Sequence, residues 1–368
     1  QGISLARISL QRSYKHLNLL PDTKMDKQSF VFPLIFLLSC SGSFSFPTKK
    51  TLANLNKYEK HLVDPAALDA VDQHLKKANP ALNSFRTSVL FYLYTKSSIN
   101  SPYVLLNNNS TLLKSSGFDK SKKTYVVSHG FMDSVHSDIT QSIKNALLTF
   151  NDVNVIGIDW SYYTKNILYS WVAGETPEVG NYVGRFVTFL VKQGLSPDNL
   201  HLIGHSLGAH VSGFAGKRFQ EEYDLKLYRI TCLDPAGPLF NYNKPTARLD
   251  RTDADVVDCI LSTRYLYGHI KLIGTANFIV NGGTVVQPPC KWEDFRTAYF
   301  CSHVSVVKYF NSSCDDWNIF EAESCYDRNG VERNCNGARM GFPASRYPTF
   351  HEMHLEVNED YPYAKEEW

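Results

Sequence analysis

The residues Gly204-His205-Ser206-Leu207-Gly208 form a G-x-S-x-G motif, between an apolar run at 200–203 and a helix-compatible run that ends near Phe219. A strand, a sharp turn and a helix in this order are typical of a nucleophile elbow. Glycines beside the turn permit close backbone approach, so the Ser206 hydroxyl is lifted above the sheet, where a base can reach it. The strand and helix signals argue against a chance match in a Gly/Ser turn, and Ser206 is the predicted nucleophile.

Around this motif, from about Lys123 onward, short apolar runs alternate with segments of helical period. This alternation is typical of βαβ units around a mostly parallel sheet. Helices are predicted at 138–150 and from just after Pro177 to Gly194, a further helix at 61–78, and an antiparallel edge strand at 85–95. The main strands are predicted at 124–127, 153–158, 200–203, 228–233, 256–261 and 276–280. The fold class is therefore α/β.

A serine hydroxyl needs a base and a carboxylate that orients the base, and in this class of fold they follow the serine in the order Asp, His. Asp234 comes directly after the strand 228–233, at the carboxyl end where α/β sites are built. An Asp before Pro235 can also serve as a turn or helix-cap residue, so a purely structural role for Asp234 is the alternative. Three further aspartates compete less well, because two lie in a charged loop and one lies inside a strand: Asp253, Asp255 and Asp258.

His303 is the predicted base, because it follows Cys301-Ser302 at the predicted start of a helix and is the last histidine before the C-terminal tail. His269, His351 and His354 have no comparable element boundary. The two histidines beside the nucleophile are too close to it in sequence and are predicted to be packing or surface residues: His205 and His210.

A tetrahedral acyl intermediate needs two hydrogen-bond donors for its oxyanion, and backbone N–H groups normally supply them. Leu207 directly follows the nucleophile and provides one N–H. The stretch Ser128-His129-Gly130-Phe131 follows the predicted strand 124–127, which makes the N–H of Phe131 the candidate for the second donor.

Composition and charge exclude several classes of protein. The 368 residues are 43% hydrophobic and 13% aromatic, which is too apolar for a disordered chain. Lys and Arg total 38 against 36 Asp and Glu, so the formal charge of +2 indicates no nucleic-acid partner. No CxxC, HExxH or calcium loop occurs, and His351-Glu352-Met353-His354 has the wrong spacing for zinc. We therefore predict no metal and no cofactor.

The early sequence indicates export. Lys24 and Lys27 flank Met25, and an apolar run at 30–38 is followed by small residues at 39–45. This order predicts a signal peptide over 25–46, a translated leader or partial reading frame over 1–24, and a mature domain over 47–368 in the extracellular space. A buried core segment, or a bacterial lipoprotein site with Cys40 as the lipidated residue, are the alternatives.

An exported chain is expected to contain disulfides. Cys290 with Cys301 and Cys314 with Cys325 bracket short loops and are the candidate pairs. Cys232 and Cys259 lie in apolar runs and are predicted to be inert buried thiols, whereas Cys335 has no assigned partner. Three N-x-S/T sequons mark accessible loops if the cell glycosylates them, and they begin at Asn108, Asn109 and Asn311.

Together these motifs resemble the animal pancreatic-lipase-type family over about residues 85–345. The motifs that occur in the family's order are Val127-Ser128-His129-Gly130-Phe131, Gly157-Ile158-Asp159-Trp160, Ile203-Gly204-His205-Ser206-Leu207-Gly208-Ala209-His210, Leu233-Asp234-Pro235-Ala236-Gly237-Pro238 and Cys301-Ser302-His303. The resemblance implies an α/β-hydrolase fold with helices on both faces of the sheet, a Ser206-Asp234-His303 triad, and oxyanion donors at Phe131 and Leu207. It also implies that Cys290 and Cys301 close the loop called the lid.

Two loops are shorter than in triglyceride lipases of the family. The lid at 291–300 has ten residues, and the neighbouring loop within 262–277 is also short. Short loops are similar to those of the phospholipase A1 branch, notably the venom phospholipases of wasps and ants, because a short lid leaves the site open to a polar headgroup. The aromatic residues of the lid either contact a membrane or pack the loop: Trp292, Phe295, Tyr299 and Phe300.

The chain stops soon after Met340-Gly341-Phe342, so we expect no C-terminal β-sandwich domain, no colipase partner and a monomer. The predicted function is a secreted phospholipase A1 that acts on phospholipid at a membrane or micelle surface. The alternatives are a neutral-lipid (triacylglycerol) or galactolipid lipase of the same family, and a catalytically silent lipid-binding member. The silent reading is disfavoured because Ser206, Asp234 and His303 are all present.

Overall fold

The computed structural model describes residues 88–326, 332–346 and 352–365. Within them, eleven strands form one sheet in the order β10-β9-β11-β8-β7-β6-β5-β3-β4-β1-β2. The strands are β1 (Leu90–Tyr94), β2 (Tyr103–Leu105), β3 (Thr124–Ser128), β4 (Asn154–Asp159), β5 (Leu200–His205), β6 (Leu227–Leu233), β7 (Ala254–Leu261), β8 (Ala276–Val280), β9 (Glu321–Tyr326), β10 (Glu332–Arg339) and β11 (Met353–Leu355). The main helices are α5 (Ser110–Ser115), α6 (Asp138–Phe150), α7 (Ser161–Thr164), α8 (Tyr169–Lys192), α9 (Leu207–Tyr223) and α10 (Phe295–Ser312).

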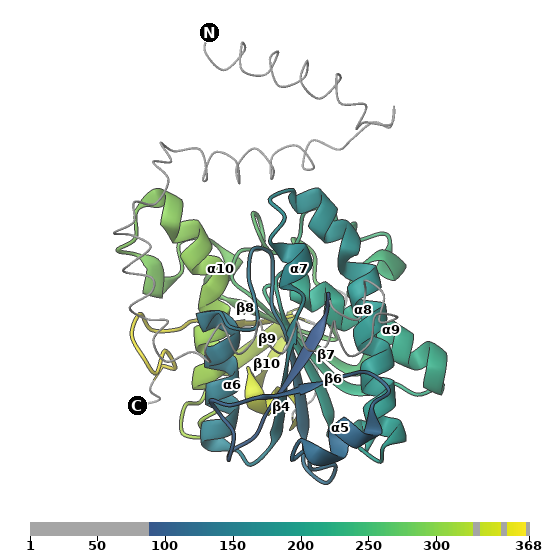
Figure 1. The fold of residues 1–368 in the computed structure, drawn as a ribbon. Helices are drawn as coiled ribbons and strands as arrows, with labels where there is room; N and C mark the ends of the chain where they lie inside the picture. The colour runs from purple at the N-terminus through teal and green to yellow at the C-terminus, as the bar shows by residue number, and fades with distance from the viewer. Residues whose placement is uncertain (1–87, 327–331, 347–351, 366–368) are drawn as a thin grey trace, which may run out of the picture. The chain divides into compact units, whose positions relative to one another are not determined.

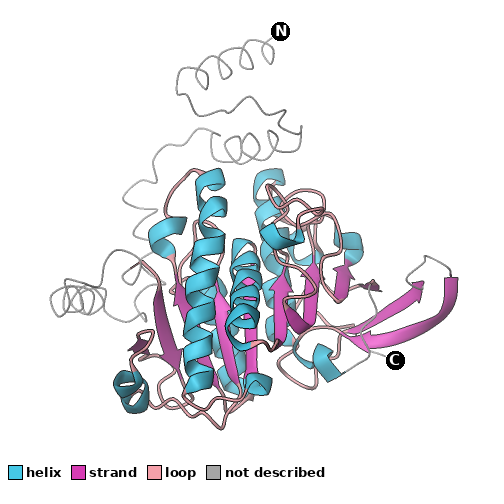
Figure 2. Ribbon diagram, turned by 90° about the vertical axis from the view of Figure 1, so that its right-hand side faces the viewer, coloured by secondary structure: helices cyan, strands magenta, loops and turns pink. Residues whose placement is uncertain are grey.

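The centre of the sheet is parallel. Strands β4, β3, β5, β6, β7 and β8 pair in parallel, β1 pairs antiparallel with β4, and β9 pairs antiparallel with β10. Helices α6 and α10 cover one face, and α8 and α9 cover the other (Figure 1). Turned by a quarter, the molecule shows the long α8 in front of the sheet and the β9–β10 hairpin at one edge (Figure 2). The predicted mostly parallel α/β sheet with helices on both faces is confirmed.

Two helix starts differ from the sequence prediction. Helix α8 begins eight residues before Pro177, so the proline lies inside it. Proline has no N–H for the carbonyl four residues earlier, which belongs to Ala173. The hydroxyl of Thr176 donates to that carbonyl at 2.8 Å, so the lost hydrogen bond is replaced locally. Helix α10 begins at Phe295 rather than at His303, which places His303 in its middle.

The predicted helix at 61–78, the signal segment at 25–46 and residues 1–24 lie outside the described residues. The six predicted parallel strands are all present, within two residues at each end. The predicted strand at 85–95 is β1, which is antiparallel as expected, but β2 and not β1 forms the sheet edge. Among the described helices, none is both long enough and apolar enough to cross a membrane.

Candidate active site

Ser206 lies at the turn between β5 and α9, with φ 56° and ψ −119°. A positive φ is costly for a residue with a side chain and is typical of strained functional turns. The flanking glycines are required by close backbone contact. A Cβ on Gly204 would lie 2.2 Å from the carbonyl oxygen of Gly208, and a Cβ on Gly208 would lie 2.2 Å from that of Ser128. The turn therefore has the elbow geometry that the motif predicts.

Asp234 directly follows β6 and is fully buried, and it contacts His303. The Nδ1–H of His303 donates to Oδ2 of Asp234 at 2.6 Å. The backbone N–H of Ser262 donates to Oδ1 at 3.0 Å, and the hydroxyl of Thr263 donates to Oδ2. Burial alone would raise the pKa of Asp234, but the hydrogen bonds and charge of His303, together with Thr263 and Ser262, outweigh it and lower the pKa. The carboxylate is thus ionised and oriented toward the imidazole.

Ser206 is held beside this pair by its main chain. Its N–H donates to the carbonyl of Leu233 at 3.0 Å, and its carbonyl accepts the N–H of Ala236 at 3.2 Å. Leu233 and Ala236 lie on either side of Asp234 in the sequence, so these two hydrogen bonds fix Ser206 next to Asp234. Within the described residues the Ser206 hydroxyl makes no hydrogen bond. Catalytic hydrogen bonds are often long in unliganded enzymes and tighten when substrate binds.

The loop after β3 packs directly on the nucleophile. A Cβ on Gly130 would lie 3.0 Å from Cβ of Ser206, so the following residue, Phe131, is carried close to the serine. His129 holds this loop, because the indole N–H of Trp160 donates to the His129 carbonyl at 2.9 Å and the backbone nitrogen of Trp160 lies 3.2 Å from Nε2 of His129. Leu207 is the first residue of α9, so its N–H has no acceptor within the helix and lies at the positive end of the helix dipole. This arrangement suits an oxyanion.

The lid prediction is correct in its disulfide and wrong in its shape. Cys290 and Cys301 form a disulfide. Residues 295–300 are helical and belong to α10, so only the first part of the segment is a loop. Trp292 is 84% exposed and donates its indole N–H to Glu359 at 2.5 Å, and Phe300 is 57% exposed. Tyr299 is half-buried, and the side chain of Phe295 lies outside the described set.

The other cysteine and asparagine predictions have mixed outcomes. Cys232 and Cys259 are buried thiols, as predicted. The pairing of Cys314 with Cys325 is wrong, because Cys314 is a free thiol buried against the end of α10, 3.5 Å from the carbonyl of Phe310. The accessible-loop prediction is also wrong for Asn311, which lies within α10.

The side-chain amides of two sequon asparagines are engaged in hydrogen bonds. Asn311 donates to the Ser142 hydroxyl at 2.9 Å. Asn109 caps α5 by accepting the N–H of Leu112, whereas Asn108 is exposed.

Four of the competing residues have structural partners of their own, and Asp255 is exposed. Asp258 pairs with Arg229 and Asp253 with Lys217. His269 contacts the carbonyls of Lys271 and Phe240, and His210 contacts that of Ala236 at 2.7 Å, so His210 is a packing residue as predicted. His354 is exposed, and His351 lies outside the described residues. In the part of the chain that is described, no group of three or more His, Cys, Asp or Glu side chains could hold a metal ion.

Sequence reasoning missed two supporting residues. Thr263 orients Asp234, and its position two residues after β7, at the same sheet end, is the signal that could have found it. His129 holds the candidate oxyanion loop, and its place beside Gly130 in the matched motif is a comparable signal.

Comparison with known proteins places the chain in a family. Lipase member H of Oryctolagus cuniculus is 36% identical over 264 residues, which are 70% of this chain and 56% of that protein. Pancreatic triacylglycerol lipase of Myocastor coypus is 33% identical over 267 residues, covering 64% of this chain and 57% of that protein. The human pancreatic triacylglycerol lipase is 32% identical over 289 residues, covering 70% and 60%. The chain thus spans less than two thirds of the length of these relatives. The sequence model of the Lipase family matches residues 61–363, and the chain belongs to that family, as its motifs predicted.

Proposed function

We propose that this protein is a secreted phospholipase A1 that hydrolyses the sn-1 acyl ester of phospholipids. The observation that carries the proposal is the hydrogen bond between His303 and the buried carboxylate of Asp234, next to a serine on a strained elbow. This is the arrangement of a nucleophile, a base and an orienting carboxylate.

In the proposed reaction Ser206 Oγ attacks the sn-1 carbonyl carbon while its proton passes to Nε2 of His303. The N–H groups of Leu207 and Phe131 stabilise the oxyanion. The tetrahedral intermediate collapses, the proton moves from His303 to the departing glycerol oxygen, and the 2-acyl lysophospholipid leaves. Water then attacks the acyl-enzyme, His303 takes its proton, and the fatty acid and the Ser206 hydroxyl are released.

Phospholipid is favoured over triacylglycerol by the two short loops. Six of the ten residues of the 291–300 segment are built into α10, and its ends are joined by the disulfide of Cys290 and Cys301. The loop between β7 and β8 is tied to the loop of Asp234, because Gly237 N–H donates to the Tyr267 carbonyl and His269 N–H to the Pro235 carbonyl, both at 2.8 Å. Neither segment is a long apolar flap. The names of the pancreatic relatives favour triacylglycerol, which remains the second candidate.

A lipid surface as the site of action is supported by exposed apolar side chains in the loops and helix starts that follow the carboxyl ends of the strands. These side chains belong to the segments after β3, β4 and β6 and to the lid: Met132, Ile167, Leu168, Trp171, Leu239, Trp292 and Phe300. Apolar and aromatic groups of this kind insert into the boundary between headgroups and acyl chains. We propose that the protein binds there as a monomer and without colipase.

The test compares the wild type with Ser206→Ala on phosphatidylcholine that carries different labels at sn-1 and sn-2, with trioleoylglycerol as a parallel substrate. We expect sn-1 release by the wild type and a loss of about 10⁴-fold or more in the variant. Ser115→Ala, at an exposed serine of α5, is the matched control and should keep full activity. Preference for trioleoylglycerol would overturn the phospholipase assignment, and no hydrolysis of either lipid would favour a silent lipid-binding protein.

Secretion is tested separately. The full chain is expressed in a eukaryotic secretory host, and the protein recovered from the medium is analysed by N-terminal sequencing. We expect the mature chain to begin near Pro47. Retention in the cell with residues 25–46 still attached would contradict the signal-peptide assignment.

A further inference from the structure

His205 lies directly before the candidate nucleophile and contacts the candidate base. Its side chain is 3% exposed, and Nε2 of its ring lies 3.2 Å from the main-chain oxygen of His303. The two imidazole rings are 4.7 Å apart at an angle of 45°. His205 Nδ1 is buried and has no hydrogen-bond partner among the described residues. The side chain therefore makes one hydrogen bond, and that bond goes to the backbone of His303.

The protonation of this ring follows from its surroundings. A carbonyl oxygen only accepts hydrogen bonds, so Nε2 must carry the proton. Burial, with a smaller effect of the neighbouring His303, lowers the pKa of His205 to about 3. The ring is neutral at physiological pH, Nδ1 is unprotonated, and no second cation competes with the imidazolium that forms on His303 during the reaction.

The same ring also touches the candidate oxyanion loop. A Cβ on Gly130 would lie 3.5 Å from Nδ1 of His205 and 3.2 Å from its carbonyl oxygen. His205 thus fills the space between this loop and α10, the helix that carries His303. Moving this one side chain would change the position of two parts of the site relative to Ser206.

We propose that His205 is a positioning residue: its Nε2–H holds the main chain of His303, and its ring supports Gly130, so that base and oxyanion donors stay aligned with Ser206. The inference rests on the proposed function and deepens it. The hydrogen bond acts through the backbone of α10, so the proposed role of His205 is to position His303 rather than to transfer its proton.

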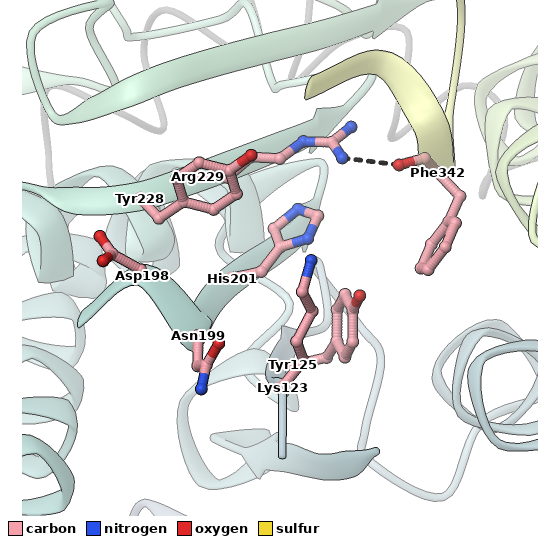
Figure 3. A pocket seen from close by; sticks show the side chains of 8 residues that line it. All are labelled: Lys123, Tyr125, Asp198, Asn199, His201, Tyr228, Arg229 and Phe342. Atoms are coloured by element: carbon pink, nitrogen blue, oxygen red, sulfur yellow. Dashed lines mark hydrogen bonds between the residues drawn. The ribbon is translucent and has the colours of Figure 1, made fainter. Parts of the chain in front are cut away.

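The chain offers a matched control on the same strand. His201 is also buried on β5, four residues before His205 and on the same face of the sheet, and its Nε2 contacts the hydroxyl of Thr231 at 2.8 Å. It lines a small cavity of about 30 Å³ with Tyr125, Arg229 and Phe342 (Figure 3). A substitution there removes a buried histidine and its hydrogen bond without touching His303.

The experiment measures kcat and KM on a soluble p-nitrophenyl ester, together with thermal unfolding, for His205→Leu, His205→Gln and His201→Leu. Gln places an N–H donor near the position of the histidine Nε2, whereas Leu has none. We expect His205→Leu to lower kcat about tenfold with little change in KM, which is the size expected for one buried hydrogen bond. His205→Gln should restore most of kcat, and His201→Leu should lower the melting temperature while the folded fraction keeps wild-type kcat.

Labelling of Ser206 by a fluorophosphonate gives the active fraction of each variant. It also distinguishes a failure of the proposed function from a failure of the positioning role of His205. A wild type that neither labels nor hydrolyses the ester would overturn the proposed function. A labelled, active wild type with equal kcat in His205→Leu, or a Gln variant as slow as the Leu variant, would overturn the positioning role alone. If His205→Leu does not fold, His205→Asn, whose shorter amide cannot reach the carbonyl, takes its place with the same expected loss.

Discussion

Among the described residues, the candidate triad can be compared with a second cluster that also contains a buried histidine, a hydroxyl and an aspartate but does not have the geometry of a catalytic site. Toward the amino end of β5, His201 contacts the Thr231 hydroxyl, which donates to Asp258 at 3.0 Å. At the carboxyl end of the same sheet, His303 contacts Asp234 beside Ser206. Figure 3 shows the His201 side chain of the first cluster next to Arg229.

The difference lies in what each aspartate and each hydroxyl already bind. Asp258 is neutralised by Arg229, which donates to both of its oxygens at 2.7 and 2.9 Å and to the carbonyls of Gly341 and Phe342. The Thr231 hydroxyl lies inside a regular strand and is engaged on both sides. The Ser206 hydroxyl is unengaged within the described residues, on a turn of positive φ. Residue types alone therefore do not make a triad, because the hydroxyl must also be exposed to a base and left unpaired.

The largest expected effect is a loss of activity when Asp234, but not Asp258, is replaced by asparagine. Asp234→Asn should lower kcat/KM by about 10⁴-fold, because an amide no longer stabilises the imidazolium or selects its tautomer. The overall fold should remain, since the amide keeps the shape of the carboxylate. Hydrolysis of a soluble ester and circular dichroism of the same sample measure both. An active Asp234→Asn enzyme would show that another carboxylate serves the base.

Asp258→Asn should give the opposite result. It leaves the guanidinium of Arg229 buried without a counter-charge, which costs about 3–5 kcal/mol of unfolding free energy. The folded fraction should keep its kcat, because Asp258 does not contact His303. Urea unfolding gives the free energy. A double variant with Arg229→Leu and Asp258→Leu should be less destabilised than the single one, and a loss below about 1 kcal/mol in the single variant would contradict the role of the pair.

A third test uses pH at Asp159, near the candidate oxyanion loop. Burial alone would raise the pKa of Asp159, but contacts with His129 and Ser161 lower it to about 2. A folded-state pKa below the unfolded one gives stability that is complete above about pH 4 and is lost as the pH falls through about 2. The unfolding free energy of wild type relative to Asp159→Asn should therefore shrink by about 2 kcal/mol from pH 5 to pH 2. Asp152→Asn, at an exposed aspartate, should show no comparable trend.

The smallest expected effect is at Thr263, whose hydroxyl donates to Asp234. Thr263→Val should lower kcat/KM about tenfold, the size of one hydrogen bond to a charged group. Because that hydroxyl helps to lower the pKa of Asp234, its loss should raise this pKa, and activity in acid should fail at a higher pH than in wild type. Thr188→Val, a buried threonine of α8 bonded to Gly184, is the control. An unchanged pH profile would argue that the backbone N–H groups of Ser262 and Thr263 suffice.

The central sheet could be predicted from sequence because buried parallel strands are continuous apolar runs, such as Ile230–Leu233 within β6. The strands that escaped prediction carry weaker patterns. β2 and β11 have three residues each, too few for a period, and β10 reads Glu-Arg-Asn-Cys-Asn-Gly-Ala-Arg without an apolar run. The start of α8 was also missed, because the compensating bond of Thr176 cannot be read from composition.

The candidate triad could be predicted because each member follows an element boundary or a motif, as Asp234 follows β6. The residues that hold it could not be predicted in the same way. The bond of His205 to His303 spans 98 positions, so only the folded chain brings the two together. The disulfide prediction for Cys314 was wrong for a related reason. It rested on the short sequence spacing to Cys325, but at the end of α10 the Cys314 thiol is buried in the core.

The long sequence separations at the site also have a kinetic consequence. The contact of Asp234 with His303 spans 69 positions, whereas α8 and α9 form through contacts within a few residues. Non-local contacts form late in folding because a long chain segment must first be closed. During refolding from urea, helical ellipticity should therefore return before hydrolysis does. The recovery of enzymatic activity then reports the rate of the last folding step, in which α10 packs against the sheet.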